Sequence, residues 1–401
     1  MKILIVNCVY DPEPVVSAQI GKALAEELSN NGHDVEVLAP FPSRPAGFKF
    51  NADFVKDKIN TQQLSKTLKV SRLPSFICPK SNVLGRLWES ISFGWHTYRY
   101  ILDHANEIDR VYMNTWPLFG QYGVAKACKK RNIPYAVHIQ DLYPESLTNK
   151  LPGVIGKLAY PLLFKFEKYT LKNASKIIAI SRKMKNFIAS SRAVDADKIE
   201  VVLNWQEQKD FIPYGDTWPS TKRTFMYLGN IGPVAGLPLV LNAFIKANVN
   251  AQLVLAGSGS KLEECKEIAE KNPGFDIVFR EVPGGQVPKV QSEAHVLLLP
   301  MIKGAASSSI PSKLPAYMFS ERPIIVLADK GSDTANAVIE AQCGWVGEAE
   351  DVDWLANTIQ EVALEQDASL KKLGLNGRDY CLRNFSKEVN LTKLVWSIVN
   401  E

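Results

Sequence analysis

The chain has 401 residues, of which 46% are hydrophobic and 22% are charged, with a formal net charge of +5. This length exceeds what one hydrophobic core supports, so we expect two domains of a water-soluble globular protein. The mild charge gives no reason to expect a nucleic-acid partner, and no apolar run reaches the length of a membrane-spanning helix. Six scattered cysteines without metal-ligand spacing indicate free thiols in a reducing compartment, and therefore a cytoplasmic protein.

Strand-like and helix-like segments alternate along most of the chain. A first series of strands is expected at Lys2–Asn7, His33–Pro40, Arg110–Asn114, Pro134–His138, Ser175–Ile180 and Lys198–Asn204. A polar, proline-containing stretch at 204–223 follows, and then a second series at Thr224–Asn230, Ala251–Gly257, Asp276–Arg280, His295–Pro300 and Arg322–Ala328. The alternation predicts an α/β protein with two doubly wound Rossmann-like domains, 1–205 and 206–385, that face each other across a cleft. We expect the last helix, about 386–401, to pack back on the first domain.

Small residues at Gly304–Ser309 separate one of these strands from a short helix. Such a loop lets backbone amides approach a ligand, and a helix start adds free N–H donors that suit a phosphate. Pro315 has no N–H, so the helix begins no earlier than about Ser312, and Lys313 lies in its first turn. A cation there is unfavourable for the helix itself, which suggests a bound anion. An ordinary strand–loop–helix with an incidental lysine is the equally weighted alternative.

The second domain offers further glycine-rich turns. Gly229, Gly232 and Gly236 form a GxxGxxxG spacing in front of a helix expected at 237–247, and Gly257 opens another helix entry. The segment 279–290 follows a strand and suits contact between its backbone and a flat base. Tight turns or surface loops without a ligand remain the alternative for each of these segments.

In the first domain, acidic residues follow the strand that ends at His138. Asp141 and Glu145 lie just past its carboxyl end, where two acids can hold sugar hydroxyls or take a proton. The alternative for Asp141 is a helix N-cap, and a purely structural role carries more weight for Glu145 than for Asp141. We expect His138 to be a core residue.

An aromatic-rich helix is expected between Lys80 and Leu102. Its apolar residues recur at helical spacing, and Arg86 and Arg99 flank them: Leu84, Leu87, Trp88, Ile91, Trp95, Tyr98 and Leu102. A second apolar segment rich in lysine follows at 156–176. Both can lie in a membrane interface, and both can equally be amphipathic helices whose aromatic residues belong to a core.

Several short segments carry a family resemblance, and they occur in family order over nearly the full length. They are NGHDVEVLAP (31–40), QDLYPES (140–146), IIAIS (177–181), VLNW (202–205), YLGNIG (227–232), LAGSG (255–259), HVLLLP (295–300) and PSKLPAYM (311–318). On these segments the chain resembles the family 4 glycosyltransferases of the GT-B fold, particularly bacterial enzymes that build capsule, O-antigen and colanic-acid polysaccharides. The resemblance implies that the second domain binds a nucleotide sugar and the first an acceptor. It also implies that the anomeric configuration is retained and that neither a metal nor a cofactor is required.

The chain departs from the family pattern at several positions. Two glutamates that many members carry are replaced here by Ser308 and Ala316, and the usual Arg and Lys after the second domain's first strand are absent. Lys313 is therefore the obvious cation near the diphosphate. Where many members have His–Asp, this chain has Gln140–Asp141, so Asp141 is the retained acid.

The resemblance, carried onto these positions, predicts the following site residues. We expect Asp141 and Lys313 to be catalytic, and Ser17, Gln140 and Glu145 to contact the acceptor or the sugar. The expected nucleotide-sugar site comprises Gly229, Asn230, Ile231, Gly232, Gly257, Arg280, Val282, Ser308, Ser309, Ser312, Lys313 and Leu314. Trp88 and Trp95 are expected to contact the membrane.

The predicted activity is transfer of a hexosyl or N-acetylhexosaminyl group. The donor is expected to be a UDP-sugar, and the acceptor a polyprenyl-diphosphate-linked saccharide at the inner face of an anionic cell membrane, where the protein is peripheral. Two alternatives stay open. One is a nucleotide-sugar epimerase of the same fold, and the other is an inactive relative that serves as a binding subunit, which the missing glutamates suggest.

Overall fold

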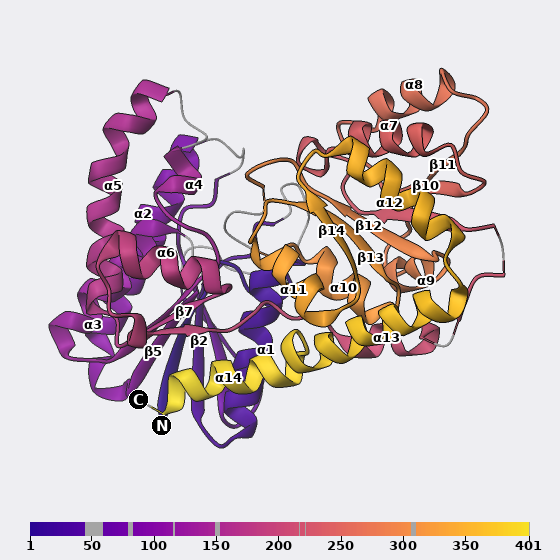
Figure 1. Ribbon diagram of the computed structural model, residues 1–401. Coiled ribbons are helices and arrows are strands. Elements are labelled where there is room, and N and C mark those ends of the chain that lie inside the picture. Colours follow the sequence, from indigo (N-terminus) through magenta and orange to yellow (C-terminus); the bar gives the residue numbers. More distant parts are fainter. Residues whose placement is uncertain are drawn as a thin grey trace. The chain divides into compact units, whose positions relative to one another are not determined.

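The computed structural model describes residues 1–44, 59–78, 83–114, 117–148, 153–215, 217–220, 222–305 and 310–400. The chain forms two compact units (Figure 1). The first comprises Met1–Val202 together with Leu391–Glu401, and the second comprises Leu203–Asn390.

The first unit is built on a sheet whose described strands follow the order β3-β4-β2-β1-β5-β6-β7-β8. The strands are β1 (Lys2–Val6), β2 (Asp34–Pro40), β3 (Asn60–Gln63), β4 (Leu68–Leu73), β5 (Arg110–Asn114), β6 (Tyr135–Ile139), β7 (Lys176–Ala179) and β8 (Ile199–Val201). All neighbours pair in parallel except β3 and β4. Central strands such as β1 and β6 are mostly apolar and almost completely buried, because helices cover a parallel sheet on both faces.

The helices of the first unit connect these strands. They are α1 (Val16–Asn30), α2 (Val83–Asp103), α3 (Leu118–Arg131), α4 (Glu145–Thr148), α5 (Gly153–Asn173) and α6 (Arg182–Arg192), with short 3-10 turns at Ala105–Glu107 and Ala196–Lys198. Glycines allow α2 and α3 to touch through their backbones. A Cβ on Gly94 would lie 2.4 Å from the Phe119 carbonyl oxygen, and one on Gly123 would lie 2.5 Å from the Gly94 carbonyl oxygen.

The second unit contains a sheet with the order β11-β10-β9-β12-β13-β14 in the described residues, and its pairs are all parallel. Its strands are β9 (Thr224–Leu228), β10 (Gln252–Ala256), β11 (Asp276–Arg280), β12 (Val296–Pro300), β13 (Ile324–Ala328) and β14 (Gly344–Glu348). Alternate residues of β9 enter two different hydrophobic clusters, Met226 and Leu228 in one and Phe225 and Tyr227 in the other. Helices therefore cover both faces, as the sequence predicts.

The helices of the second unit begin close to the expected positions. They are α7 (Leu237–Ala247), α8 (Leu262–Glu270), α9 (Val287–Ser292), α10 (Lys313–Phe319), α11 (Asp333–Ala341), α12 (Val352–Leu364) and α13 (Asp367–Asn384), with 3-10 turns at Gln208–Asp210, Ile212–Tyr214 and Pro233–Ala235. Helix α10 starts at Lys313, in agreement with the limit that Pro315 sets. The last helix, α14 (Lys387–Val399), starts in the second unit, and its residues from Leu391 on belong to the first.

Candidate functional site

A cavity of about 180 Å³ lies at the carboxyl ends of β9 and β12, within the second unit. It is lined by Tyr227, Asn230, Gly232, Pro233, Val234, Ala235, Leu299, Pro300, Met301, Ala305, Pro311 and Lys313. The turn after β9 and the segment that leads into α10, which the sequence marks separately as phosphate-binding candidates, thus meet at one site. This edge of a parallel sheet is where open α/β folds bind their ligands.

Lys313 is the cation of this cavity. Its Nζ lies 5.5 Å from the centre of the Tyr227 ring, and no carboxylate among the described residues pairs with it. Burial lowers the pKa of the Lys313 ammonium. A desolvated cation in the first turn of a helix, without a described counter-ion, is suited to binding an anion.

Gly229 makes room for this lysine. Its φ is +146°, and a Cβ there would lie 2.1 Å from the Cε of Lys313. Gly257, at the end of the neighbouring strand, is required for a similar reason, since its Cβ would lie 2.0 Å from the Gly229 carbonyl oxygen. Both glycines therefore act through close packing of backbone and side chain.

The turn after Gly229 is held by hydrogen bonds that leave some amides available. The Ile231 amide donates to the Ser258 carbonyl (2.8 Å), and the Tyr227 hydroxyl donates to the Asn230 carbonyl (2.6 Å). The amides of Asn230 and Gly232 donate to no described residue. Together with Lys313 they offer the donors that a diphosphate accepts.

The other residues predicted for the nucleotide sugar lie in varied surroundings. Ile231 and Leu314 are fully buried, and Ser312 is exposed in front of α10. Arg280 forms an ion pair with Glu293. Gly257, Arg280 and Val282 do not line the cavity, and Ser308 and Ser309 lie outside the described residues.

In the first unit, Asp141 is exposed on the loop between β6 and α4. Helix α4 begins at Glu145, so Asp141 does not occupy its N-cap position. The neighbouring Gln140 lies with its Nε2 2.9 Å from Nε2 of His138, whose Nδ1 is 2.8 Å from the Tyr112 hydroxyl. Burial lowers the pKa of His138 to about 3, so this histidine is a neutral core residue that supports Gln140.

Glu145 already has partners for both carboxylate oxygens. Its Oε2 lies 2.6 Å from a guanidinium nitrogen of Arg192, and its Oε1 accepts a 2.9 Å hydrogen bond from the Tyr160 hydroxyl. Arg192 is fully buried and also pairs with Glu167. Nothing in the sequence pattern indicates this network, because its members come from three different helices.

The sequence also fails to indicate the role of Glu13. This buried carboxylate accepts hydrogen bonds from the backbone amides of Tyr10 (3.0 Å), Ser43 (2.9 Å) and Arg44 (3.0 Å), and it thereby shapes the loop between β1 and α1. Ser17 follows in the first turn of α1, where its carbonyl lies 3.5 Å from the Asn114 side-chain nitrogen. A buried acid can be recognised only from its surroundings, which the sequence does not provide.

The tryptophans of α2 are on the surface of the protein. Trp88 is 57% exposed and Trp95 is 59% exposed, whereas Phe93 and Ile101 of the same helix are buried. The interpretation of these two tryptophans as core residues is therefore wrong. Helix α5 exposes a second apolar stripe, formed by Val154, Ile155, Leu158 and Leu162. Among the described residues, no helix has the length and apolar character needed to cross a bilayer.

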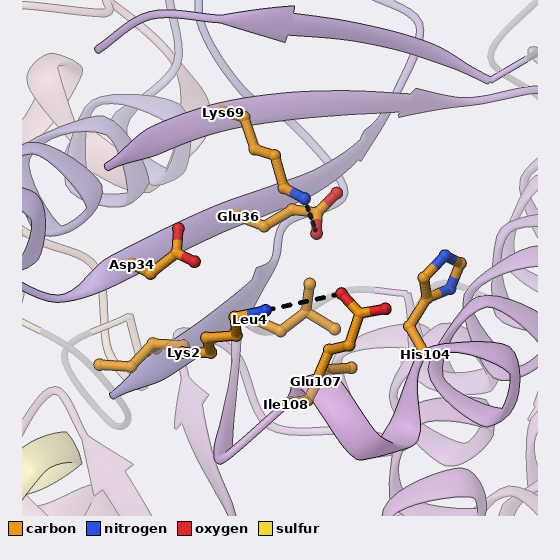
Figure 2. A pocket seen from close by; sticks show the side chains of 9 residues that line it. Lys2, Leu4, Asp34, Glu36, Lys69, His104, Glu107 and Ile108 are labelled. Atoms are coloured by element: carbon orange, nitrogen blue, oxygen red, sulfur yellow. Dashed lines mark ion pairs between the residues drawn. The ribbon is translucent and has the colours of Figure 1, made fainter. Parts of the chain in front are cut away.

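A second hollow, at the amino ends of β1, β2 and β4, is unsuited to a substrate (Figure 2). Its volume is about 30 Å³, which is room for little more than water. Its two lysines pair with its two glutamates, Lys2 with Glu107 (3.7 Å) and Lys69 with Glu36 (3.1 Å). No group of three metal-ligating side chains occurs in this hollow or elsewhere in the described parts of the chain.

Comparison with known proteins identifies the class. The profile of Glycosyltransferase Family 4 matches residues 22–205, and that of Glycosyl transferases group 1 matches residues 208–380. The putative colanic acid biosynthesis glycosyl transferase WcaI of Escherichia coli (strain K12) is 24% identical over 98% of this chain and 99% of WcaI. The probable glycosyltransferase WbjE of Pseudomonas aeruginosa is 24% identical over 64% of this chain, and the match spans 65% of WbjE.

Solved structures share the fold over the full length. A glycosyltransferase from Rickettsia africae superimposes with a TM-score of 0.68 at 15% identity, covering 100% of this chain and 99% of the other. WaaG, a glycosyltransferase involved in lipopolysaccharide biosynthesis, gives 0.64 at 15% identity with both chains fully covered. HepE of Anabaena in complex with UDP gives 0.64 at 13% identity, with 98% of each chain covered. The fold is thus GT-B, as expected from the sequence, and the chain belongs to the family 4 glycosyltransferases.

Proposed function

We propose that the protein transfers a hexosyl or N-acetylhexosaminyl group from a UDP-sugar to a polyprenyl-diphosphate-linked saccharide, with retention of configuration and without a metal ion. The observation that carries the proposal is the cavity at the end of β9, which combines the desolvated cation of Lys313 with the available amides of Asn230 and Gly232. A positive charge and amides that converge on one cavity can neutralise a diphosphate in place of a metal ion. A structural neighbour on this fold, HepE, binds UDP, which supports the choice of nucleotide.

Two side chains have the main chemical roles in this proposal. Lys313 stabilises the negative charge that develops on the leaving diphosphate. Asp141, exposed at the end of β6, positions the transferred sugar or the acceptor hydroxyl, while the departing phosphate oxygen takes the acceptor proton. This assignment requires no general base beyond the leaving group itself.

The setting that we propose is cell-surface polysaccharide synthesis at the inner face of the cell membrane. WcaI is a putative colanic acid biosynthesis enzyme, and its match covers nearly the whole chain. The exposed tryptophans of α2 and the apolar stripe of α5 provide surfaces for peripheral contact with the bilayer. Arg99, 5.9 Å from the Trp95 ring, and Lys157 add positive charge that an anionic membrane attracts.

The proposal is tested by incubating the purified protein with a panel of nucleotide sugars and a polyprenyl-diphosphate-linked saccharide, with and without a chelator. We expect transfer from a UDP-sugar that the chelator does not reduce, and a product whose new linkage keeps the donor's anomeric configuration. Formation of an epimer without acceptor would show a nucleotide-sugar epimerase. Binding without turnover would show a binding subunit, and a strict need for a divalent metal would contradict the role given to Lys313.

A further inference from the structure

Arg192 ends α6 inside the first unit with its side chain completely buried. Its Nε donates to Glu167 (2.9 Å), and one terminal nitrogen donates to Ser191 Oγ (2.8 Å). The other terminal nitrogen donates both to the Tyr143 carbonyl (2.6 Å) and to Glu145 (2.6 Å). All three guanidinium nitrogens are therefore engaged.

The surroundings of Arg192 are specific to a planar guanidinium. The rings of Phe164 and Phe187 each lie with their centres 5.1 Å from its central carbon. Lysine has no planar fork and cannot make these hydrogen bonds and ring contacts at the same time. A buried charged group is also a poor way to gain stability, since well-packed apolar residues usually serve as well. The arrangement is better explained by a requirement for one fixed geometry.

The geometry that this network fixes is that of the loop between β6 and α4. Arg192 holds the end of the loop through Tyr143 and Glu145, and the Tyr160 hydroxyl of α5 holds Glu145 from the other side. The start of the loop is held by the contact between Gln140 and His138. Asp141 lies between these two points of attachment.

From this we infer that Arg192 is a positioning residue for the transfer reaction. Acting through Tyr143 and Glu145, it sets the conformation of the loop that carries Asp141, and Tyr160 completes the attachment to α5. Both carboxylate oxygens of Glu145 are thus used to hold the loop, so we assign this residue to the loop rather than to the sugar. The inference rests on the proposed function in so far as Asp141 contacts the sugar or the acceptor.

Two variants and one control test the inference. Arg192→Lys keeps the positive charge but removes the planar guanidinium. Tyr160→Phe removes a single hydroxyl at the partly exposed edge of the network, and we expect this variant to fold normally. The control is Tyr169→Phe on the same helix, because the Tyr169 hydroxyl forms no hydrogen bond with a described residue.

The first measurement is hydrogen exchange of the full chain, followed on peptides that cover 140–148. It needs no substrate, so it tests the loop even if no sugar is transferred. We expect both variants to exchange faster in this segment than the wild type, with Arg192→Lys the faster of the two, and Tyr169→Phe to match the wild type. Unchanged exchange in Arg192→Lys and Tyr160→Phe would overturn the inference.

The second measurement separates positioning from stability. A displacement of about 1 Å at a reacting group can cost about 10²-fold in rate, so we expect kcat of Arg192→Lys to fall by about that factor. For Tyr160→Phe the expected loss is about tenfold, in line with one hydrogen bond to a charged group. The Kd for UDP, which the second unit binds, should stay within twofold. A lower Tm with wild-type kcat per folded molecule would show that the network is structural only. Absence of transfer by the wild type would instead contradict the proposed function.

Discussion

Replacement of Lys313 by alanine tests the proposed donor-site role of this residue separately from any role in folding. A unit positive charge about 4 Å from a phosphate oxygen contributes about 4 kcal/mol at the effective dielectric constant of a protein surface. Loss of a comparable stabilising donor typically lowers kcat by about 10²–10³-fold. We therefore expect Lys313→Ala to reduce turnover at saturating donor by about that factor.

The same variant should be as stable as the wild type or more stable. Lys313 has no carboxylate partner among the described residues, and burial lowers the pKa of its ammonium. The folded protein thus bears the cost of a desolvated charge, which alanine removes. Thermal unfolding should give a Tm equal to or above that of the wild type.

The assay is turnover with saturating UDP-sugar, combined with calorimetric titration of UDP and a thermal melt. Lys330→Ala, which removes an exposed lysine of the same unit, is the matched control and should leave all three measurements unchanged. Turnover of Lys313→Ala within twofold of the wild type would refute the assignment. So would a fall in Tm large enough to account for the loss of activity.

Three further predictions concern the first unit. Asp141→Asn should lower kcat while the Kd for UDP stays nearly unchanged, because Asp141 is expected to act on the sugar or the acceptor. Trp88→Ser with Trp95→Ser should weaken flotation with anionic liposomes at low salt by more than tenfold, since each half-exposed indole offers roughly 100 Å² of apolar surface, or about 2.5 kcal/mol. His138→Gln should reduce the pH dependence of unfolding. Burial lowers the pKa of folded His138 to about 3, so the stability that it contributes is fully present above the unfolded pKa of about 6.5 and is lost as the pH falls. Urea unfolding measures the free energy of unfolding at pH 7.5 and at pH 5.5. The decrease between these two pH values should be about 1.4 kcal/mol smaller in His138→Gln than in the wild type.

Each of these three predictions has an outcome that contradicts it. If Asp141→Asn melts earlier but keeps its specific activity, the carboxylate is only structural. If the double tryptophan variant floats as well as the wild type, α2 does not contact the membrane. The control is Trp396→Ser, at another half-exposed tryptophan. Equal pH dependence of wild type and His138→Gln would show that this histidine is not held neutral.

Local chemistry made part of the cavity at the end of β9 predictable. Pro315 limits where α10 can begin, and the helix does start at Lys313. The spacing of Gly229 and Gly232 likewise marks a turn that lies at the cavity. These features are readable because they depend on residues that are neighbours in the sequence.

Features that depend on distant residues could not be predicted in the same way. Glu145 and Arg192 meet only because β6, β7 and the helices α5 and α6 bring them together. The helical spacing of apolar residues marked one face of α2, but it did not show that Trp88 and Trp95 are exposed while Phe93 is buried. Strand β14, which contains two glycines, lacks a continuous apolar run and gave no clear signal.

The discontinuous make-up of the first unit affects the order in which the protein can be completed during synthesis. All strands of its sheet are translated before residue 203, yet Leu391, Leu394 and Ile398 also belong to this unit and are buried. The second unit is continuous from Leu203 to Asn390. Its translation is therefore complete before residues 391–401 of the first unit are made. The first unit can therefore bury these three side chains only after the whole second unit has been translated.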